Sequence, residues 1–345
     1  MAATFNYPSV QWWVRAVLDI DRDHPGLAGQ MMRASDHRRQ ASAAVLAAHI
    51  DCDDGPQGLK VQWTRKMEIS ELLLAGRLET LIIAAYGSCP PPFLSMLSRM
   101  DDYILSPHIY RRLYDIYSND DHAAVAAALR AVKHPVDAVL DNAIGCPTWL
   151  LKTGVLPTLR SAAHRDDLVK AIELIKEVCP AADDEAIKSA LRAAAMANDT
   201  SRFIERWLRK AEFPKVQLDL NSAFTQVENA AELARWARKF KNCSQTYRLE
   251  VVSGVSAFFI CRAQSQEYMT HLRRADVNCA WEYGHTYSPS NGPVPASVRE
   301  FAETCMRNAG VIMPRGHLQV PERWRPIQRL VDPFDTDIEP LDFDI

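Results

Sequence analysis

Most of the chain before residue 213 carries apolar side chains at helical spacing. In the segment 67–87 the residues Ile69, Leu72, Leu73 and Leu78 fall on one helical face, and the proline run 90–92 then breaks the pattern. Shorter helices are predicted around 93–105, 109–117 and 121–133. We therefore expect residues 1–212 to form a helical domain.

Three consecutive helical segments follow Pro147. The first ends at Pro180, the second begins with Asp183 or Asp184 as its N-cap and ends near Asn198, and the third begins at Thr200 or Ser201. Their short connections predict a helical array. No residue-level repeat assigns this array to a named solenoid family.

After Pro214 an extended, turn-rich segment leads into an amphipathic helix. Asn229 followed by Glu232 resembles a capping box and marks its start. Helical spacing places one set of residues on an apolar face: Leu233, Trp236, Ala237, Phe240, Cys243, Ser244 and Tyr247. The opposite face carries Arg235, Arg238, Lys239 and Asn242.

Three strands and a final helix are predicted next. The strands are 255–263, 267–275 and 277–285, and short connections favour an antiparallel meander. The helix has Pro295 in its first turn and ends at Gly310, and its inner face carries Val298, Phe301, Ala302, Cys305 and Met306. We expect both helices to cover one face of the sheet, with one shared core formed by Phe240, Cys243, Tyr247, Phe258, Ile260, Trp281 and Phe301. The fold class is thus α+β and predominantly α-helical, with residues 213–330 as the second domain.

Composition narrows the functional classes. A net charge of −3 argues against a generally basic nucleic-acid coat protein, although a local basic face remains open. The 8 cysteines include no C-x-x-C pair, so we expect reduced thiols and no cofactor. The N-terminal segment lacks the features of a signal peptide, and the apolar stretches are too short to span a bilayer. These features predict a cytoplasmic protein without membrane contact.

Several short motifs in residues 220–292 occur together. They are Leu220-Asn221-Ser222, the helix start Ala230–Leu233, Asn242-Cys243 with Tyr247, Ser253-Gly254 before an aromatic strand, Trp281, and Ser290-Asn291-Gly292. In these motifs the segment resembles the C-terminal region of PcfJ-like proteins, a family associated with bacterial mobile elements. The resemblance implies this biological context and the module's fold. Asn242 stands where the family usually has His before the cysteine, and this departure weakens the inference of a His–Cys pair from the resemblance.

Cys243 has two interpretations. On the apolar helix face it would be a buried core residue with an inert thiol. As a catalytic nucleophile it would need an exposed thiolate and a nearby base, for which His271 and His285 are the candidates. A metal cluster of His271, Glu282 and His285 with Cys243 or Cys279 lacks the tight ligand spacing of metal sites, so we expect no metal site.

The basic face of Arg235, Arg238 and Lys239 also has two interpretations. It is either a solvated helix face or a surface that contacts phosphates without reading sequence. Further basic residues lie upstream at Arg202, Arg206, Arg209 and Lys210.

The segment 331–345 is acidic and also carries large apolar side chains, including Phe334 and Phe343. Acidic ends commonly solubilise a protein, but five large apolar residues are typical of a docking peptide. We expect this tail to bind a basic, partly apolar groove, on a protein partner or on its own chain at residues 315–329 or 235–239.

Phosphate-binding and hydrolase motifs are absent from the sequence. The leading hypothesis is therefore a non-enzymatic binding or regulatory protein of a bacterial mobile element or of host–element conflict, with protein or nucleic-acid contacts. The alternative is a cysteine-dependent hydrolase or transferase that uses Cys243 with a histidine.

Overall fold

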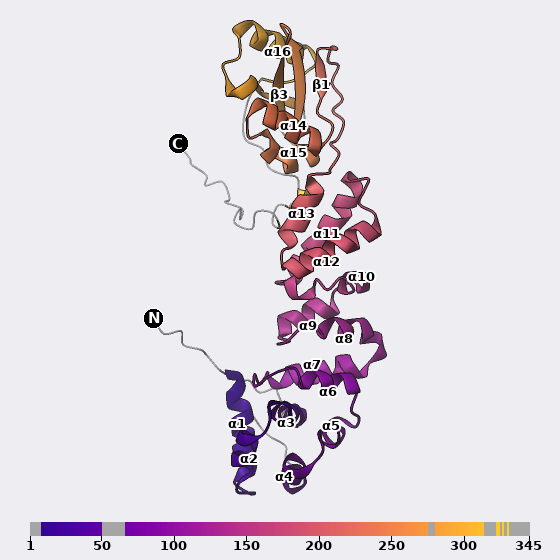
Figure 1. Ribbon diagram of the computed structural model, residues 1–345, viewed down its shortest axis with the longest axis vertical. Coiled ribbons are helices and arrows are strands. Elements are labelled where there is room, and N and C mark those ends of the chain that lie inside the picture. Colours follow the sequence, from indigo (N-terminus) through magenta and orange to yellow (C-terminus); the bar gives the residue numbers. More distant parts are fainter. Residues whose placement is uncertain are drawn as a thin grey trace, which may run out of the picture. The chain divides into compact units, whose positions relative to one another are not determined.

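The computed structural model describes residues 8–49, 66–274, 280–313, 322–324, 326–327 and 330. The chain divides into two compact units, Met1–Ala162 and Ala163–Ile345, whose elements are labelled in Figure 1. The division precedes the boundary expected at residue 212, because the last three helices before the sheet belong to the second unit. The fold is α+β and predominantly helical, as the sequence predicts.

Unit 1 consists of helices. They are α1 (Pro8–Asp21), α2 (Leu27–Arg33), α3 (Asp36–Ala48), α4 (Lys66–Ala75), α5 (Leu78–Tyr86), α6 (Pro91–Leu97), α7 (Pro107–Ser118), α8 (Ala123–Leu129), α9 (Asp137–Ile144) and α10 (Thr148–Leu151), with 3₁₀ turns η1 (Asp120–His122) and η2 (Leu156–Thr158). The predicted proline break is confirmed: α5 ends at Gly87, whose φ is 83°, and Pro91 begins α6.

A buried glutamine organises the centre of unit 1. Gln40 on α3 is fully buried, and its side-chain amide donates to the carbonyls of Met100, Asp101 and Tyr103 at 2.7–3.0 Å. Its Oε1 accepts a hydrogen bond from the Tyr110 hydroxyl at 2.6 Å. These bonds satisfy the buried amide and fix the segment before α7 against α3.

Unit 2 begins with α11 (Ala162–Val178), α12 (Asp184–Ala197) and α13 (Thr200–Leu208). Asp183 caps α12 by accepting a hydrogen bond from the amide of Ala186 at 2.8 Å, as predicted. The N-cap of α13 is Asp199, one residue before the expected start. Backbone hydrogen bonds then tie the chain after α13 back to α11, with Glu212 N donating to Val178 O at 2.8 Å.

The sheet contains the predicted antiparallel meander and one additional strand. Its strands are β1 (Phe224–Gln226), β2 (Ser256–Ala263), β3 (Gln266–Arg274) and β4 (Trp281–Tyr287), in the order β1-β2-β3-β4. The expectation of three strands missed β1, because three residues in a polar segment show no strand pattern. Gln264 and Ser265 form the β2–β3 turn with φ values of 50° and 60°.

The helices of this part are α14 (Ala230–Phe240), α15 (Arg248–Val252) and α16 (Ala296–Asn308), with 3₁₀ turns η3 (Ser244–Tyr247), η4 (Pro289–Asn291) and η5 (Glu322–Trp324). The expectation that two helices cover one face of the sheet is wrong. Helix α16 packs on the face of Phe259 and Cys261, whereas the segment after α14 packs on the face of Phe258 and Met269. The sheet therefore lies between two helical layers.

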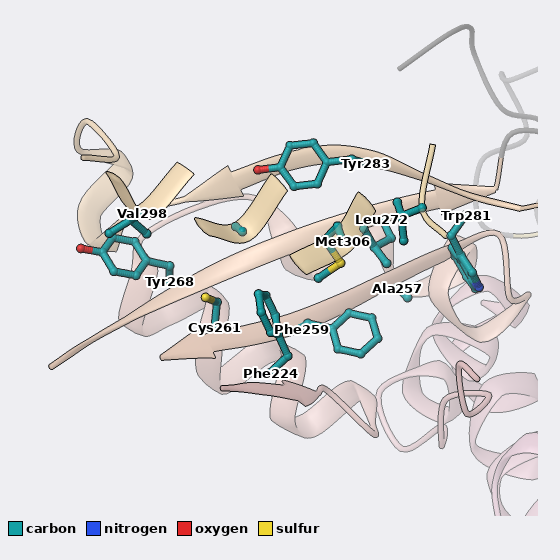
Figure 2. Packing of buried hydrophobic residues seen from close by; sticks show 12 residues of the cluster. Phe224, Ala257, Phe259, Cys261, Tyr268, Leu272, Trp281, Tyr283, Val298 and Met306 are labelled. Atoms are coloured by element: carbon teal, nitrogen blue, oxygen red, sulfur yellow. The ribbon is translucent and has the colours of Figure 1, made fainter. Parts of the chain in front are cut away.

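The core between α16 and the sheet is apolar and closely packed. Figure 2 shows its side chains, among them Phe259, Cys261 and Met306, gathered between the strands and α16. Trp281 is buried here, as expected, at 8% exposure. The predicted single core is nevertheless wrong, because Phe240, Phe258 and Ile260 are buried on the other side of the sheet.

Candidate functional site

The basic helix α14 ends earlier than its apolar pattern predicts. Its N-terminus follows the prediction, since Asn229 Oδ1 accepts a hydrogen bond from the amide of Glu232 at 2.8 Å. The helix stops at Phe240 because Lys241 takes a left-handed conformation with φ 50°. The chain therefore changes direction before Cys243.

This early end exposes Cys243 to solvent. The residue precedes η3, and the turn is fixed by Asn242, whose Oδ1 accepts from the backbone amide of Ser244 at 3.1 Å and from its hydroxyl at 2.7 Å. The interpretation of Cys243 as a buried core residue is wrong. The prediction continued the helical periodicity past residue 240, where the helix ends, and so placed the thiol on the buried apolar face.

Cys243 lines a pocket of about 300 Å³ where the segment after α14 meets the end of β4. The lining residues are Asn242, Cys243, Ser244, Tyr247, His285, Thr286, Tyr287, Ser288, Asn291 and Gly292. The side-chain amide of Asn291 donates to the carbonyl of Lys241 at 3.4 Å and so links the η4 loop to the end of α14. The lining, as the structure describes it, contains no Asp, Glu, Lys or Arg side chain.

Aromatic rings form part of this pocket. The rings of His285 and Tyr287 meet edge to face, with centroids 4.9 Å apart. Burial raises the pKa of the Tyr287 phenol, and the neighbouring Tyr247 and Cys243 add to the rise. The phenol therefore stays neutral and can both donate and accept a hydrogen bond in the pocket.

The second candidate histidine is buried beneath the site. His271 pairs with His285 across β3 and β4, but its ring stacks on Phe258 at a centroid distance of 4.4 Å. Its Nε2 lies 3.1 Å from the hydroxyl of Ser256. Burial, helped by the charge of Arg273, lowers the pKa of His271 to about 3, so the ring is neutral. It is not among the residues that line the pocket.

Cys243 and His285 thus line the same pocket but do not form a hydrogen-bonded pair in the described structure. Among the described residues, neither imidazole makes a hydrogen bond to the Cys243 thiol, and no three His, Cys, Asp or Glu side chains are grouped to hold a metal ion. Cys279 lies outside the described residues. Glu282 is buried at 1% exposure, and within the described part of the chain neither of its carboxylate oxygens has a hydrogen-bond partner. The arrangement supports binding more directly than an assembled nucleophile.

The predicted basic face is partly neutralised. Arg235 pairs with Glu232 at 3.2 Å, and Lys239 pairs with Glu267. Both cations also lie over the ring of Trp236, at 5.4 and 4.8 Å from its centroid. In the described part of the chain Arg238 has no carboxylate partner, and its Nε donates to the carbonyl of Ala234 at 3.2 Å.

Sequence reasoning missed Tyr287 and Asn291 as site residues. The only local signal was the turn sequence Ser290-Asn291-Gly292, in which Ser290 and Asn291 both have positive φ values, of 59° and 52°. The other predicted binding residues, Phe334 and Phe343, lie outside the described residues together with the acidic tail.

In the described ranges, no single helix is long and apolar enough to cross a membrane, although α5 and α6, bent by 114°, pass the length and composition test as a pair. No protein-family model matches the chain, and neither the curated proteins nor the solved structures contain a significant match.

Proposed function

We propose that the chain is a non-enzymatic binding or regulatory protein of a bacterial mobile element or of host–element conflict. Within it, the pocket beside α14 binds single-stranded nucleic acid. The biological context rests on the resemblance of residues 220–292 to PcfJ-like proteins. The ligand class rests on the chemistry of the pocket.

One observation carries this proposal: a pocket of about 300 Å³ combines aromatic rings with uncharged hydrogen-bonding groups. The rings of Tyr247, His285 and Tyr287 offer surfaces on which a nucleobase can stack. The amides of Asn242 and Asn291 can pair with the polar edge of an unstacked base.

The neighbouring helix end supplies positive charge for the phosphates. Arg238 and Lys241 are both exposed, at the end of α14 and directly after it. Asn242, the next residue, lines the pocket. A base in the pocket would therefore place its backbone near two exposed cations, in agreement with a local basic surface on an acidic chain.

The test is fluorescence anisotropy with a labelled single-stranded oligonucleotide. We expect Tyr287→Ala to weaken binding about 5- to 150-fold, the equivalent of about 1–3 kcal/mol for one lost stacking partner. His285→Ala removes an exposed ring and serves as a second variant with less risk to folding. Arg238→Glu should weaken binding to all sequences and reduce its dependence on salt.

Arg307→Glu is the matched control, since Arg307 is an exposed arginine near the end of α16, on the other side of the sheet. It should bind like the unmodified protein. Affinity that is unchanged in Tyr287→Ala, His285→Ala and Arg238→Glu alike would exclude this pocket as the nucleic-acid site.

A second function, thiol-dependent catalysis, is favoured by one observation: the exposed Cys243 shares its pocket with His285. If His285 activates the thiol, His285→Gln should slow alkylation of Cys243 at neutral pH at least about tenfold. Equal alkylation rates in the two proteins would leave binding as the function of the pocket.

A further inference from the structure

A second concave surface of unit 2 lies between α12 and α13, which pack side by side (Figure 1). The groove has a volume of about 580 Å³. Its apolar lining is made of small residues and one ring: Ala190, Ala193, Ala194, Ala197 and Phe203. Alanines leave room along α12 that larger apolar side chains from elsewhere can fill. Met196, next to Ala197, is 92% exposed and adds apolar surface to the same helix.

One side of the groove is cationic. Arg202, Arg206 and Arg209 line it from α13 and the residue after it, at helical spacing. Asp199 and Glu205 line the same side of the groove, where Asp199 pairs with Arg202 at 3.7 Å and Glu205 pairs with Arg209 at 3.2 Å. Arg206 has no carboxylate partner among the described residues, so the groove retains positive charge.

Arg248 adds to this field from α15. Helix α15 packs against α13. Burial lowers the pKa of the Arg248 guanidinium and the positive charge of Arg209 lowers it further, whereas the carboxylate of Glu205 raises it. A groove with an apolar floor and a cationic wall selects an occupant that is both acidic and apolar.

The described chain ends beside this groove. Leu330 is buried at 5% exposure, and its carbonyl accepts a hydrogen bond of 2.6 Å from the hydroxyl of Ser201, the residue before Arg202. Arg323 pairs with Glu177 of α11 at 3.6 Å, and Trp324 and Ile327 are fully buried. Leu330 therefore lies at the first turn of α13.

The segment 331–345 has the matching chemistry. It lies outside the described residues, and its sequence contains no basic residue. Its acidic residues are Asp332, Asp335, Asp337, Glu339, Asp342 and Asp344, and its large apolar residues include Phe334, Ile338, Leu341, Phe343 and Ile345. We propose that residues 331–345 bind the α12–α13 groove of their own chain, with carboxylates against the arginines and apolar side chains on the alanine floor.

The segment is long enough for this contact. A 15-residue segment reaches up to about 50 Å when extended, whereas the nine residues of α13 span roughly 14 Å. Attachment at Leu330 also gives the segment a high effective concentration at the groove, so weak contacts suffice. The inference does not depend on the nucleic-acid pocket.

Photo-crosslinking in the full chain tests the proposal. Phe343→p-benzoylphenylalanine places a photoreactive ring in the segment, and methionine is a favoured partner of this group. Irradiation at about 20 mM salt should link it, within one chain, to the tryptic peptide 193–202, which contains Met196. The yield should fall at least about tenfold at about 500 mM salt, because exposed charge pairs are then screened.

Charge reversal supplies the matched pair of variants. The double variant Arg206→Glu/Arg209→Glu should reduce the yield of this cross-link at low salt by a similar factor. Both substitutions lie outside the tryptic peptide 193–202, so the peptide itself is unchanged. Arg299→Glu with Arg307→Glu, on α16, should leave it intact. Links to another part of the chain, links between two chains, or no link at all would each overturn the proposal.

Discussion

The two faces of the sheet in unit 2 differ in how they are covered. On one face α16 runs as a regular helix of 13 residues, and Cys261 beneath it is fully buried. On the other face α14 ends at Phe240, the chain turns, and Cys243 is exposed at a pocket. The site is therefore created by the interruption of the helical layer on this face, not by the sheet itself.

Thiol labelling should separate the two faces most strongly. Cys243 is exposed, whereas burial closes off Cys261 and raises its pKa to about 11. We expect Cys243 to react with iodoacetamide at least about 1000-fold faster, since Cys261 must wait for opening of the core. Peptide mapping by mass spectrometry measures both rates in one sample.

The two rates should become equal in strong denaturant, which is the control for intrinsic reactivity. Comparable protection of both thiols in the native protein would show that the end of α14 does not open this face.

A truncation on the α16 face should have the next largest effect. Trp281 is buried there and also stacks with the guanidinium of Arg274 at 4.7 Å. Trp281→Ala should destabilise unit 2 by about 3–5 kcal/mol, because the cavity lies in a closely packed core. Hydrogen exchange of the β2 and β3 amides reports this loss. His285→Ala, on the exposed pocket side, should change the unfolding free energy reported by the same amides by less than about 0.5 kcal/mol.

The pocket face should show the stronger dependence on pH, through His271. Its pKa is about 3 in the folded chain, and an unfolded histidine titrates near 6.5. The unfolded state therefore binds the extra proton between these values, so stability is complete above about pH 6.5 and decreases as the pH falls towards 3. Between pH 7.5 and 5 the loss should be about 2 kcal/mol. His271→Phe keeps the stack on Phe258 and should flatten this part of the profile; an unchanged slope would mean that other groups cause it.

A smaller effect is expected at Gly284. A β-carbon there would lie 3.1 Å from the carbonyl oxygen of His271 and 3.3 Å from its Nδ1. Gly284→Ala should cost about 1 kcal/mol, because the neighbours must shift slightly. Gly292→Ala is the comparison, since its nearest contact would be 3.4 Å. Equal stability of Gly284→Ala and the unmodified protein, measured by hydrogen exchange, would show that this strand adjusts freely.

The sequence predicts helices and their boundaries correctly where one hydrophobic periodicity continues through the whole element. The proline break before α6, the Asn229 cap and the inner face of α16 follow from local rules and are confirmed. The same periodicity failed after Phe240, because a left-handed Lys241 carries no distinctive sequence signal. Lysine is rarely found at that conformation.

The site was less predictable than the fold. Cys243 and His285 were named as a possible pair, and the structure does place both at one pocket. Tyr287 and Asn291 join them only because β4 and the η4 loop come back to the end of α14. Such contacts depend on long-range packing, which residue spacing along the chain does not encode.

The exposed Asn291 at the pocket rim also bears on chemical ageing. Asn291 is followed by Gly292, whose small size lets its backbone nitrogen attack the asparagine side chain, with loss of ammonia and formation of a succinimide. Water then opens this ring to aspartate or isoaspartate. Gly292 N donates a hydrogen bond of 3.2 Å to Pro289 O, which must break first and so slows this deamidation. Each event replaces a neutral amide with a carboxylate at the pocket and adds one dalton to the chain. A preparation stored for long at alkaline pH therefore becomes a mixture of unmodified chains with a neutral rim and deamidated chains whose rim repels phosphate.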